Sequence, residues 1–222
     1  MNYILQIETA TKNCSVAISL NGKTIASQEI AEDGYTHAEN LHVFINEVIQ
    51  QAEITFKELK AVAVSAGPGS YTGLRIGVSA AKGLCYTLNI PLIAINTLEV
   101  LAQQIAVPEG NIIIPMIDAR RMEVYCAIFD SNHQLLRETQ AEILTENSFS
   151  EFTETCHFIG DSNTKAKEVL TKENFVFVDT MVYPSAKDMS ALAFQKYEEK
   201  AFEDVAYYEP FYLKSFVITT KN

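Results

Sequence analysis

The side chains that build metal centres and nucleophilic sites are scarce in this chain. Its 222 residues include four histidines, four cysteines and no tryptophan. No C-x-x-C pair occurs, which excludes a zinc ribbon and a thioredoxin-type motif, and the spread of the cysteines is typical of a reducing compartment. His37 and His42 are five residues apart, about 140° around a helix, so they do not form the i, i+4 pair of a helical metal site. We expect His37 to be exposed, and we assign no metal ligand and no catalytic residue.

Basic residues are also few. The chain has 17 Lys and Arg against 28 Asp and Glu, a net charge of −11 and no run of five basic residues. Because phosphate binding needs clustered cations, direct binding to nucleic acid or to an anionic membrane is disfavoured. No apolar run of about 18 residues occurs, and the amino end enters a strand without a basic leader. We therefore expect neither a transmembrane helix nor a signal peptide, and a cytoplasmic location.

What the chain does contain is an alternation of apolar segments typical of an α/β protein. The first half predicts the order βββαβαβα, with a hairpin turn at Asn21-Gly22, and a second three-strand start follows a linker at 107–111. A duplicated unit with a mixed sheet flanked by helices is the economical interpretation, with lobes at 1–106 and 107–222 and a C-terminal segment that can pack back on the first lobe. The predicted strands are 4–9, 15–20, 23–30, 61–66, 91–95, 112–117, 124–129, 134–143, 157–159 and 175–178. The predicted helices are 37–52 with Thr36 as N-cap, 74–88, 96–105, 164–170 and 186–200, before an extended segment at 207–220.

The segment from Gly67 to Gly77, GPGSYTGLRIG, carries the strongest local signal. It lies between a buried strand and a helix, where backbone N–H groups can bind an anion. Gly73, Gly77 and Ala81 also share one helix face, which predicts close packing against a second helix, either 37–52 of this chain or a helix of another protein. The spacing matches neither a dinucleotide fingerprint nor a P-loop nor a nucleophile elbow. Anion binding and tight packing both stay open.

Three other turns hold polar side chains that could contact a phosphate. Thr9 and Thr11 lie between the first two strands, where hydroxyl groups bond either a phosphate or their own backbone. Gly160 and Asp161 precede a helix, which makes them either an anion turn or a capped helix start. The turn at 118–123 carries adjacent arginines and is either a tight turn held by salt bridges or a small acceptor site for a carboxylate or phosphate.

Taken together, these segments resemble the bacterial TsaB (YeaZ) family. The resemblance covers most of the chain, and the 67–77 motif is its most specific part. The matching segments are Ile7–Thr11, Cys14–Ala17, Gly67–Gly77, Ala80–Leu84, Asp118–Arg120, Glu123–Tyr125, Pro210 and Tyr212-Leu213.

The resemblance implies an actin-like ATPase (ribonuclease H-like) architecture with two lobes of duplicated fold. It also implies a role in making threonylcarbamoyladenosine in tRNA, next to the anticodon. In that system the paralogue TsaD transfers the threonylcarbamoyl group to adenosine. A TsaB-like chain is expected to be a non-catalytic scaffold that pairs with TsaD, with the small ATPase TsaE joining them. It is expected to form a homodimer when TsaD is absent, and to contact tRNA only indirectly.

The family pairing surface is formed by the helices that correspond to 37–52 and 74–88. The residues expected there are Leu41, Phe44, Ile45, Val48, Gly73, Leu74, Gly77, Val78 and Ala81. Nucleotide contacts would fall to Thr9, Thr11, Gly160 and Asp161. Weak binding of ATP or ADP is the most that we expect, because Glu8 stands where actin-like kinases place an Asp. The H-x-x-x-H metal pair of TsaD does not occur, and neither does a protease constellation. The alternative is an autonomous actin-like-fold ATPase or small-molecule kinase.

Overall fold

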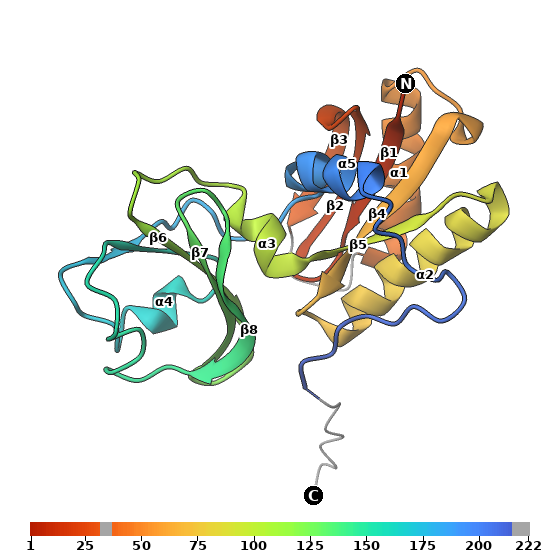
Figure 1. Cartoon of the computed structure of the whole chain (residues 1–222). Helices are drawn as coiled ribbons and strands as arrows, with labels where there is room; N and C mark the ends of the chain where they lie inside the picture. The colour runs from red at the N-terminus through yellow and green to blue at the C-terminus, as the bar shows by residue number, and fades with distance from the viewer. Residues whose placement is uncertain (32–36, 215–222) are drawn as a thin grey trace, which may run out of the picture.

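Two five-stranded mixed sheets form the framework of the protein (Figure 1). The computed structural model describes residues 1–31 and 37–214. The first sheet has the order β3 (Lys23–Ala31), β2 (Asn13–Leu20), β1 (Tyr3–Glu8), β4 (Leu59–Gly67) and β5 (Leu92–Asn96). The second has the order β10 (Phe175–Phe177), β9 (Cys156–Ile159), β6 (Ile112–Asp118), β7 (Glu123–Asp130) and β8 (Leu135–Ile143).

The two sheets repeat one connection pattern. In the first, β1, β2 and β3 are antiparallel, and β4 and β5 run parallel to β1. In the second, β6, β7 and β8 are antiparallel, and β9 and β10 run parallel to β6. This repetition confirms the predicted duplicated fold with a mixed sheet in each half. The division of the chain at 106/107 stays a prediction.

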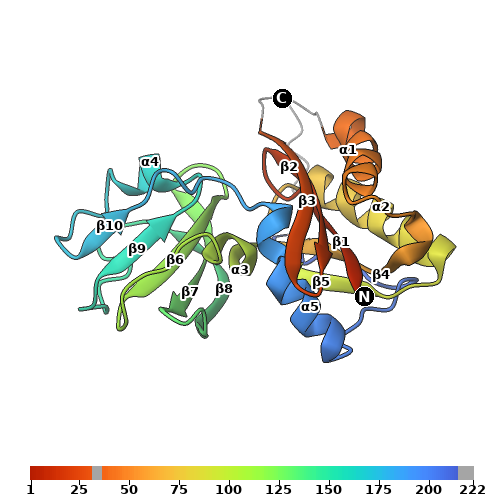
Figure 2. The ribbon, with the colours of Figure 1, turned by 90° about the horizontal axis from the view of Figure 1, so that it is seen from above.

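Helices cover both faces of the first sheet. The helices are α1 (His37–Gln51), α2 (Tyr71–Leu88), α3 (Thr97–Ala102), α4 (Asn163–Ala166) and α5 (Ser190–Glu198), with 3₁₀ turns η1 (Phe56–Glu58) and η2 (Ala186–Met189). α1 and α2 lie on one face of the first sheet, and α5 lies on the other (Figure 2). α3 joins the two halves, because its apolar side chains pack against those of β6 and β7. None of the described helices is long and apolar enough to cross a membrane.

The alternation of side chains along the strands explains the long apolar runs. Leu5 and Val62 belong to the core under α1 and α2, whereas Ile4 and Ala61 belong to the core under α5. Successive side chains of a strand point to opposite faces, so a strand covered on both faces is apolar throughout. Each fully buried large aliphatic side chain contributes about 1.5–3 kcal/mol of transfer free energy. These cores hold α1 and α2 in place on their sheet.

Most predicted elements are present, with differences at helix ends. The hairpin turn is confirmed, with φ of 49° at Asn21 and 83° at Gly22. The helix predicted at 164–170 ends as α4 at Ala166, because the bonds from Glu168 N to Lys165 O (3.3 Å) and from Val169 N to Ala166 O (3.1 Å) have i→i+3 spacing. The helix predicted at 186–200 begins as the 3₁₀ turn η2. The Thr36 N-cap and residues 215–220 of the predicted extended segment lie outside the described residues.

Candidate partner-binding surface

The glycine-rich turn before α2 is folded tightly onto the loop between β1 and β2. Ser70 donates its backbone N–H to Ala10 O (2.7 Å), and its Oγ accepts the N–H of Gly73 (3.2 Å) as the helix N-cap. Gly67 donates its N–H to Thr97 Oγ1 (3.2 Å). A Cβ at Gly69 would overlap the backbone of Ala10. Because the chain itself uses these N–H groups, the geometry favours the tight-packing alternative over anion binding.

The small-residue face of α2 points into the protein. A Cβ at Gly73 would overlap Thr9 O, and a Cβ at Gly77 would overlap Thr9 Oγ1. Thr9 Oγ1 donates in turn to Gly73 O (2.8 Å), and Ala81 is fully buried. The prediction that this face meets a partner is therefore wrong. Its glycines let α2 approach the central strand β1 and the loop that follows it, a contact that the helix pattern does not reveal.

The apolar residues predicted for the partner surface are also core residues. Leu41, Ile45, Val48, Leu74 and Val78 are at most 4 % exposed and belong to the cluster between the helices and the sheet. Of the predicted set, Phe44 alone is half-buried. An amphipathic pattern indicates that a helix buries one face, but it does not say whether a sheet of the same chain or a partner covers that face. The assignments of Leu41, Val48, Leu74 and Val78 are corrected accordingly, whereas Ile45 also lines the groove described next.

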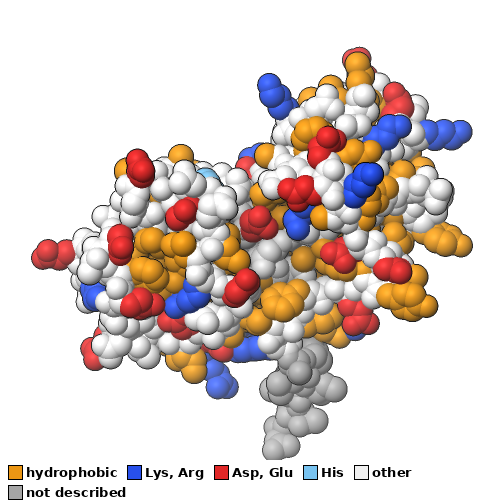
Figure 3. Space-filling model, in the orientation of Figure 1, with side chains coloured by type: hydrophobic (Ala, Val, Ile, Leu, Met, Phe, Trp, Pro, Cys, Tyr) orange, Lys and Arg blue, Asp and Glu red, His pale blue; other side chains and the backbone are white. Residues whose placement is uncertain are grey.

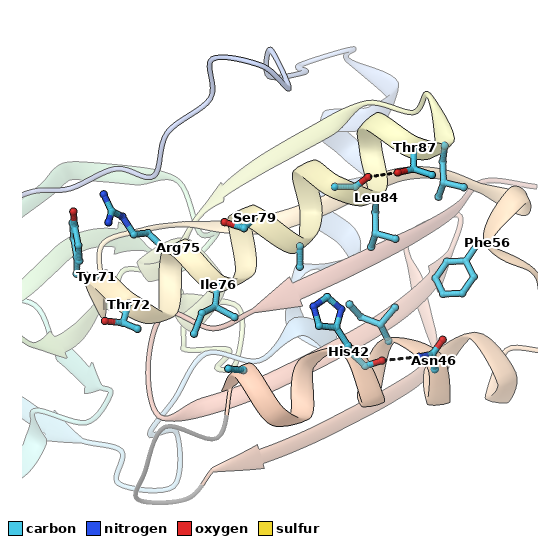
Figure 4. Close-up of a pocket in the computed structure, with 15 residues that line it drawn as sticks. His42, Asn46, Phe56, Tyr71, Thr72, Arg75, Ile76, Ser79, Leu84 and Thr87 are labelled. Atoms are coloured by element: carbon cyan, nitrogen blue, oxygen red, sulfur yellow. Dashed lines mark hydrogen bonds between the residues drawn. The ribbon is translucent and has the colours of Figure 1, made fainter.

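A different face of the two helices lines an open apolar groove with a volume of about 1020 Å³ (Figure 4). His42 rises from α1 into the space between the helices, and Ile76 and Leu84 project into it from α2. Gly83 lies on the exposed side of α2, and a Cβ there would meet nothing within 4 Å. The lining residues of this α1–α2 groove are Ala38, His42, Ile45, Asn46, Phe56, Tyr71, Thr72, Arg75, Ile76, Ser79, Ala80, Gly83, Leu84, Thr87 and Leu88.

A signal for this groove is present in the sequence. Thr72, Ile76, Ala80 and Gly83, followed by Thr87, form a second stripe of small and apolar residues at helical spacing on α2. When a helix has two such stripes on different faces, one packs against the core of its own chain and the other stays available for a further contact. The groove and the predicted surface thus share α1, α2 and the residue Ile45, but most of the predicted residues face the sheet.

One end of the groove is joined to the C-terminal part of the chain. We call residues 205–213 the C-terminal strap. The Tyr212 ring lies 4.8 Å from that of Tyr71, and Tyr212 OH accepts a hydrogen bond from Arg75 Nε (3.3 Å). Lys82 Nζ donates to Ala206 O (3.1 Å) and Tyr208 O (3.0 Å). These contacts fix the strap along the side of α2 that faces away from α1, where a second cavity of about 200 Å³ lies.

The loop predicted to hold a phosphate after β1 is filled by the chain. Glu8 is fully buried, and its carboxylate accepts hydrogen bonds from Ala10 N (2.6 Å) and Ser65 Oγ. Burial raises the pKa of Glu8 from 4.5 to about 7, although these hydrogen bonds oppose the shift. Thr11 O contacts His37 Nε2 (2.7 Å). His37 is thus buried, contrary to prediction, because its ring closes the loop.

The second predicted phosphate turn is likewise bonded internally. Gly160 N donates to Met181 O (2.7 Å), and a Cβ at Gly160 would overlap Met116 O. Asp161 Oδ1 accepts the N–H of Asp118 (2.8 Å), and burial raises the pKa of Asp161 to about 6. Nucleotide binding by Thr9, Thr11, Gly160 and Asp161 stays a prediction, with most of its polar groups already in use.

The paired arginines lie in the four-residue turn 119–122 between β6 and β7. Arg120 and Arg121 have φ of 71° and 53°, the left-handed region, and Glu123 N donates to Arg120 O (3.2 Å). Lys165 Nζ contacts Asp118 and the carbonyl of Arg121 (2.9 Å). The structure supports the tight-turn alternative, and the acceptor alternative stays open. Within residues 1–31 and 37–214, no group of three or more His, Cys, Asp or Glu is placed to hold a metal ion.

Two lobes with the same mixed-sheet connection pattern define the protein as an actin-like, ribonuclease H-like α/β protein. A solved structure of YeaZ from Pseudomonas aeruginosa has this fold, with a TM-score of 0.84 at 24 % identity over 96 % of this chain and 100 % of that one. The family model of TsaD, tRNA N6-adenosine threonylcarbamoyltransferase, matches residues 25–218.

The curated relatives are more specific. The tRNA threonylcarbamoyladenosine biosynthesis protein TsaB of Escherichia coli is 28 % identical over 98 % of this chain and 97 % of its own length. The TsaB protein of Buchnera aphidicola subsp. Schizaphis graminum is 30 % identical over 87 % of this chain and 93 % of its own length. The chain therefore belongs to the family of the matching TsaD model and, within it, to the TsaB proteins.

Proposed function

We propose that this chain is the non-catalytic subunit of a complex that transfers the threonylcarbamoyl group to tRNA, and that it docks a TsaD-like paralogue in the α1–α2 groove. TsaB proteins are named for tRNA threonylcarbamoyladenosine biosynthesis, and membership of that family puts the chain in this process. In the proposal a TsaE-like ATPase joins the pair, and the partners supply the tRNA contact. Without the paralogue, the same groove pairs two copies of this chain.

The observation that carries the proposal is the unfilled groove between two helices that are themselves well anchored. Its floor holds Ile76, Leu84 and Phe56, and small residues line the ridge of α2 at Ala80 and Gly83. Helices pack with their axes 8–10 Å apart, and small residues at the contact allow the closest approaches. No atom of residues 1–31 or 37–214 would meet a Cβ at Gly83, so an approaching partner helix would explain its cost of about 1 kcal/mol relative to alanine.

The described thiols and the surface charge favour a structural role over a catalytic one. Burial raises the pKa of Cys14 to about 11 and those of Cys85, Cys126 and Cys156 to about 12, so these thiols are poor nucleophiles near neutral pH. Acidic side chains are spread over the visible face of both lobes, which is a poor surface for RNA phosphates (Figure 3). A subunit that supplies shape to a tRNA-binding partner needs neither feature.

The test is a bulky charge in the groove. Ala80→Arg should weaken binding to the purified TsaD-like paralogue more than 100-fold, because the side chain occupies the space of a docked helix. Ala191→Arg, on the exposed side of α5, is the matched control and should bind as the wild type does. Both variants should unfold at the wild-type denaturant concentration. Normal binding by Ala80→Arg would remove the groove from the proposal.

The assigned role is tested by leaving out one subunit at a time from a reconstituted tRNA-modification reaction. The chain alone should transfer no threonylcarbamoyl group, and its omission should abolish modification by the others. Ala80→Arg should behave like the omission, whereas Ala191→Arg should support full modification. Turnover by the isolated chain would favour the alternative of an autonomous enzyme.

A further inference from the structure

Arg75 is the one Lys, Arg, Asp or Glu among the described residues that line the α1–α2 groove. It lies near the start of α2, projects away from α1 and is exposed to solvent (Figure 4). α2 itself contains no Asp or Glu. The groove therefore presents an apolar floor with a single permanent cation at one end.

The guanidinium of Arg75 is held in place by two tyrosines. Its central carbon lies 4.2 Å from the centroid of the Tyr71 ring, and its Nε donates to Tyr212 OH (3.3 Å). Tyr212 is itself fixed, because the C-terminal strap is bonded to α2 through Lys82 and to β4 through Phe211 N and Ala66 O (2.7 Å). A side chain that is ordered before binding loses less entropy when a partner arrives.

The hydrogen-bonding capacity of this guanidinium is largely unused. Nε is bonded, but no carboxylate of the described residues lies within ion-pair distance of Arg75, and Glu209 acts on it only through a longer-range charge interaction. Several other described cations pair with a carboxylate, as Lys187 does with Glu29 (2.8 Å), so Arg75 is among those that do not. A guanidinium fork matches the two oxygens of a carboxylate, and arginine and tyrosine are enriched among residues that dominate binding energy.

We propose that Arg75, held between Tyr71 and Tyr212, receives a carboxylate of the docked partner at the end of the groove where α2 begins. This inference rests on the proposed function and specifies its chemistry: the occupant is a protein surface with an apolar helix face and an Asp or Glu beside it. The strap takes part in recognition through Tyr212, although it lies outside the helix pair. We choose an acidic partner surface because the groove lining contains Arg75 and no Asp or Glu, so a carboxylate would meet a cation and no like charge.

The test compares the affinity of four variants for the purified TsaD-like paralogue at low and high salt. Arg75→Gln should bind about 10- to 100-fold more weakly and lose most of the salt dependence, because a charge-assisted hydrogen bond is removed. Arg75→Lys should be intermediate, since it keeps the charge but not the fork. Tyr212→Phe should bind the paralogue a few-fold more weakly, and its affinity should depend on salt as that of the wild type does. Lys23→Gln, at an exposed cation on β3, is the matched control and should be unchanged.

Three results would overturn the proposal, and each is separable from failure of the proposed function. Arg75→Gln could bind within twofold of the wild type while Ala80→Arg does not bind, which would keep the groove and remove the anchor. Arg75→Gln and Tyr212→Phe could lose equal affinity with the wild-type salt dependence, which would reduce Arg75 to a support for the strap. Arg75→Lys could bind as weakly as Arg75→Gln, which would show that the positive charge does not contribute to the affinity.

Discussion

The two faces of α2 are built from similar residues and do different things. The inner face has Gly73, Gly77 and Ala81, and each glycine lies where a Cβ would overlap the β1–β2 loop. The outer face has Ala80 and Gly83, with open space at Gly83. Small residues indicate that something comes close to a helix. The atoms around each glycine then show whether that neighbour belongs to the chain or has to be another molecule.

The comparison gives opposite expectations for one substitution at two positions. At the inner face, glycine to alanine should damage the fold. At the outer face, the same change should leave the fold intact and affect association. We order the predictions by the size of the expected effect.

Gly73→Ala should cause the largest loss of stability. The new methyl would overlap the backbone carbonyl of Thr9, which cannot move without disturbing β1. We expect a loss of about 3 kcal/mol in the free energy of unfolding, as for overpacking against backbone in a close-packed interior. Urea unfolding monitored by circular dichroism measures it. Wild-type stability in this variant would mean that the inner face is not packed as described.

Glu8→Gln tests the loop under that face. The folded-state pKa of Glu8, about 7, lies above its ordinary value of 4.5. Below pH 4.5 both folded and unfolded chains hold the proton. As pH rises from 4.5 through 7, the unfolded chain releases it first, so the contribution of Glu8 to stability falls. Above pH 7 a constant penalty remains.

The glutamine variant should therefore be more stable than the wild type at pH 8, by about 3 kcal/mol, because the folded-state pKa of about 7 already includes the hydrogen bonds to the carboxylate. The two proteins should converge near pH 4.5. Urea unfolding across this pH range gives the difference directly. A constant difference between the two curves would show that Glu8 does not titrate between pH 4.5 and 7.

Gly83→Ala should have the smallest effect on folding and the opposite sign. With nothing near the added methyl, the isolated chain should gain up to about 1 kcal/mol, because alanine is the better helix former. Binding to the TsaD-like paralogue should weaken several-fold, since the methyl separates two closely packed helices. Stability comes from unfolding curves and affinity from titration. A stabilised variant with unchanged affinity would place the partner elsewhere on the surface.

The sequence predicted the fold well for a physical reason. Strands such as 61–66 and helices such as 37–52 are encoded by local periodicity, and the Asn21-Gly22 turn by backbone conformational preference. The assignment of helix faces failed because Leu41 or Gly77 would look the same against a partner as against its own sheet. The buried position of His37 depends on a contact with Thr11, which lies 26 residues away, and no local pattern reports such a contact.

The candidate site was predicted in part. The resemblance placed it on the first two helices, where the structure has the groove. Arg75 was quoted in the motif but given no role, because its importance depends on Tyr212, which lies 137 residues further along the chain. Long-range placement of single side chains is the part of the site that sequence patterns do not encode.

Thiol labelling in the groove tests the central claim most directly. All four native cysteines are buried, so Gly83→Cys provides one accessible thiol on the outer face of α2, and Lys23→Cys provides a matched thiol on β3. The account predicts that a saturating TsaD-like paralogue slows maleimide labelling of Cys at position 83 at least tenfold and leaves position 23 unchanged. Formation of the complex with equal labelling rates at position 83, with and without the partner, would contradict it.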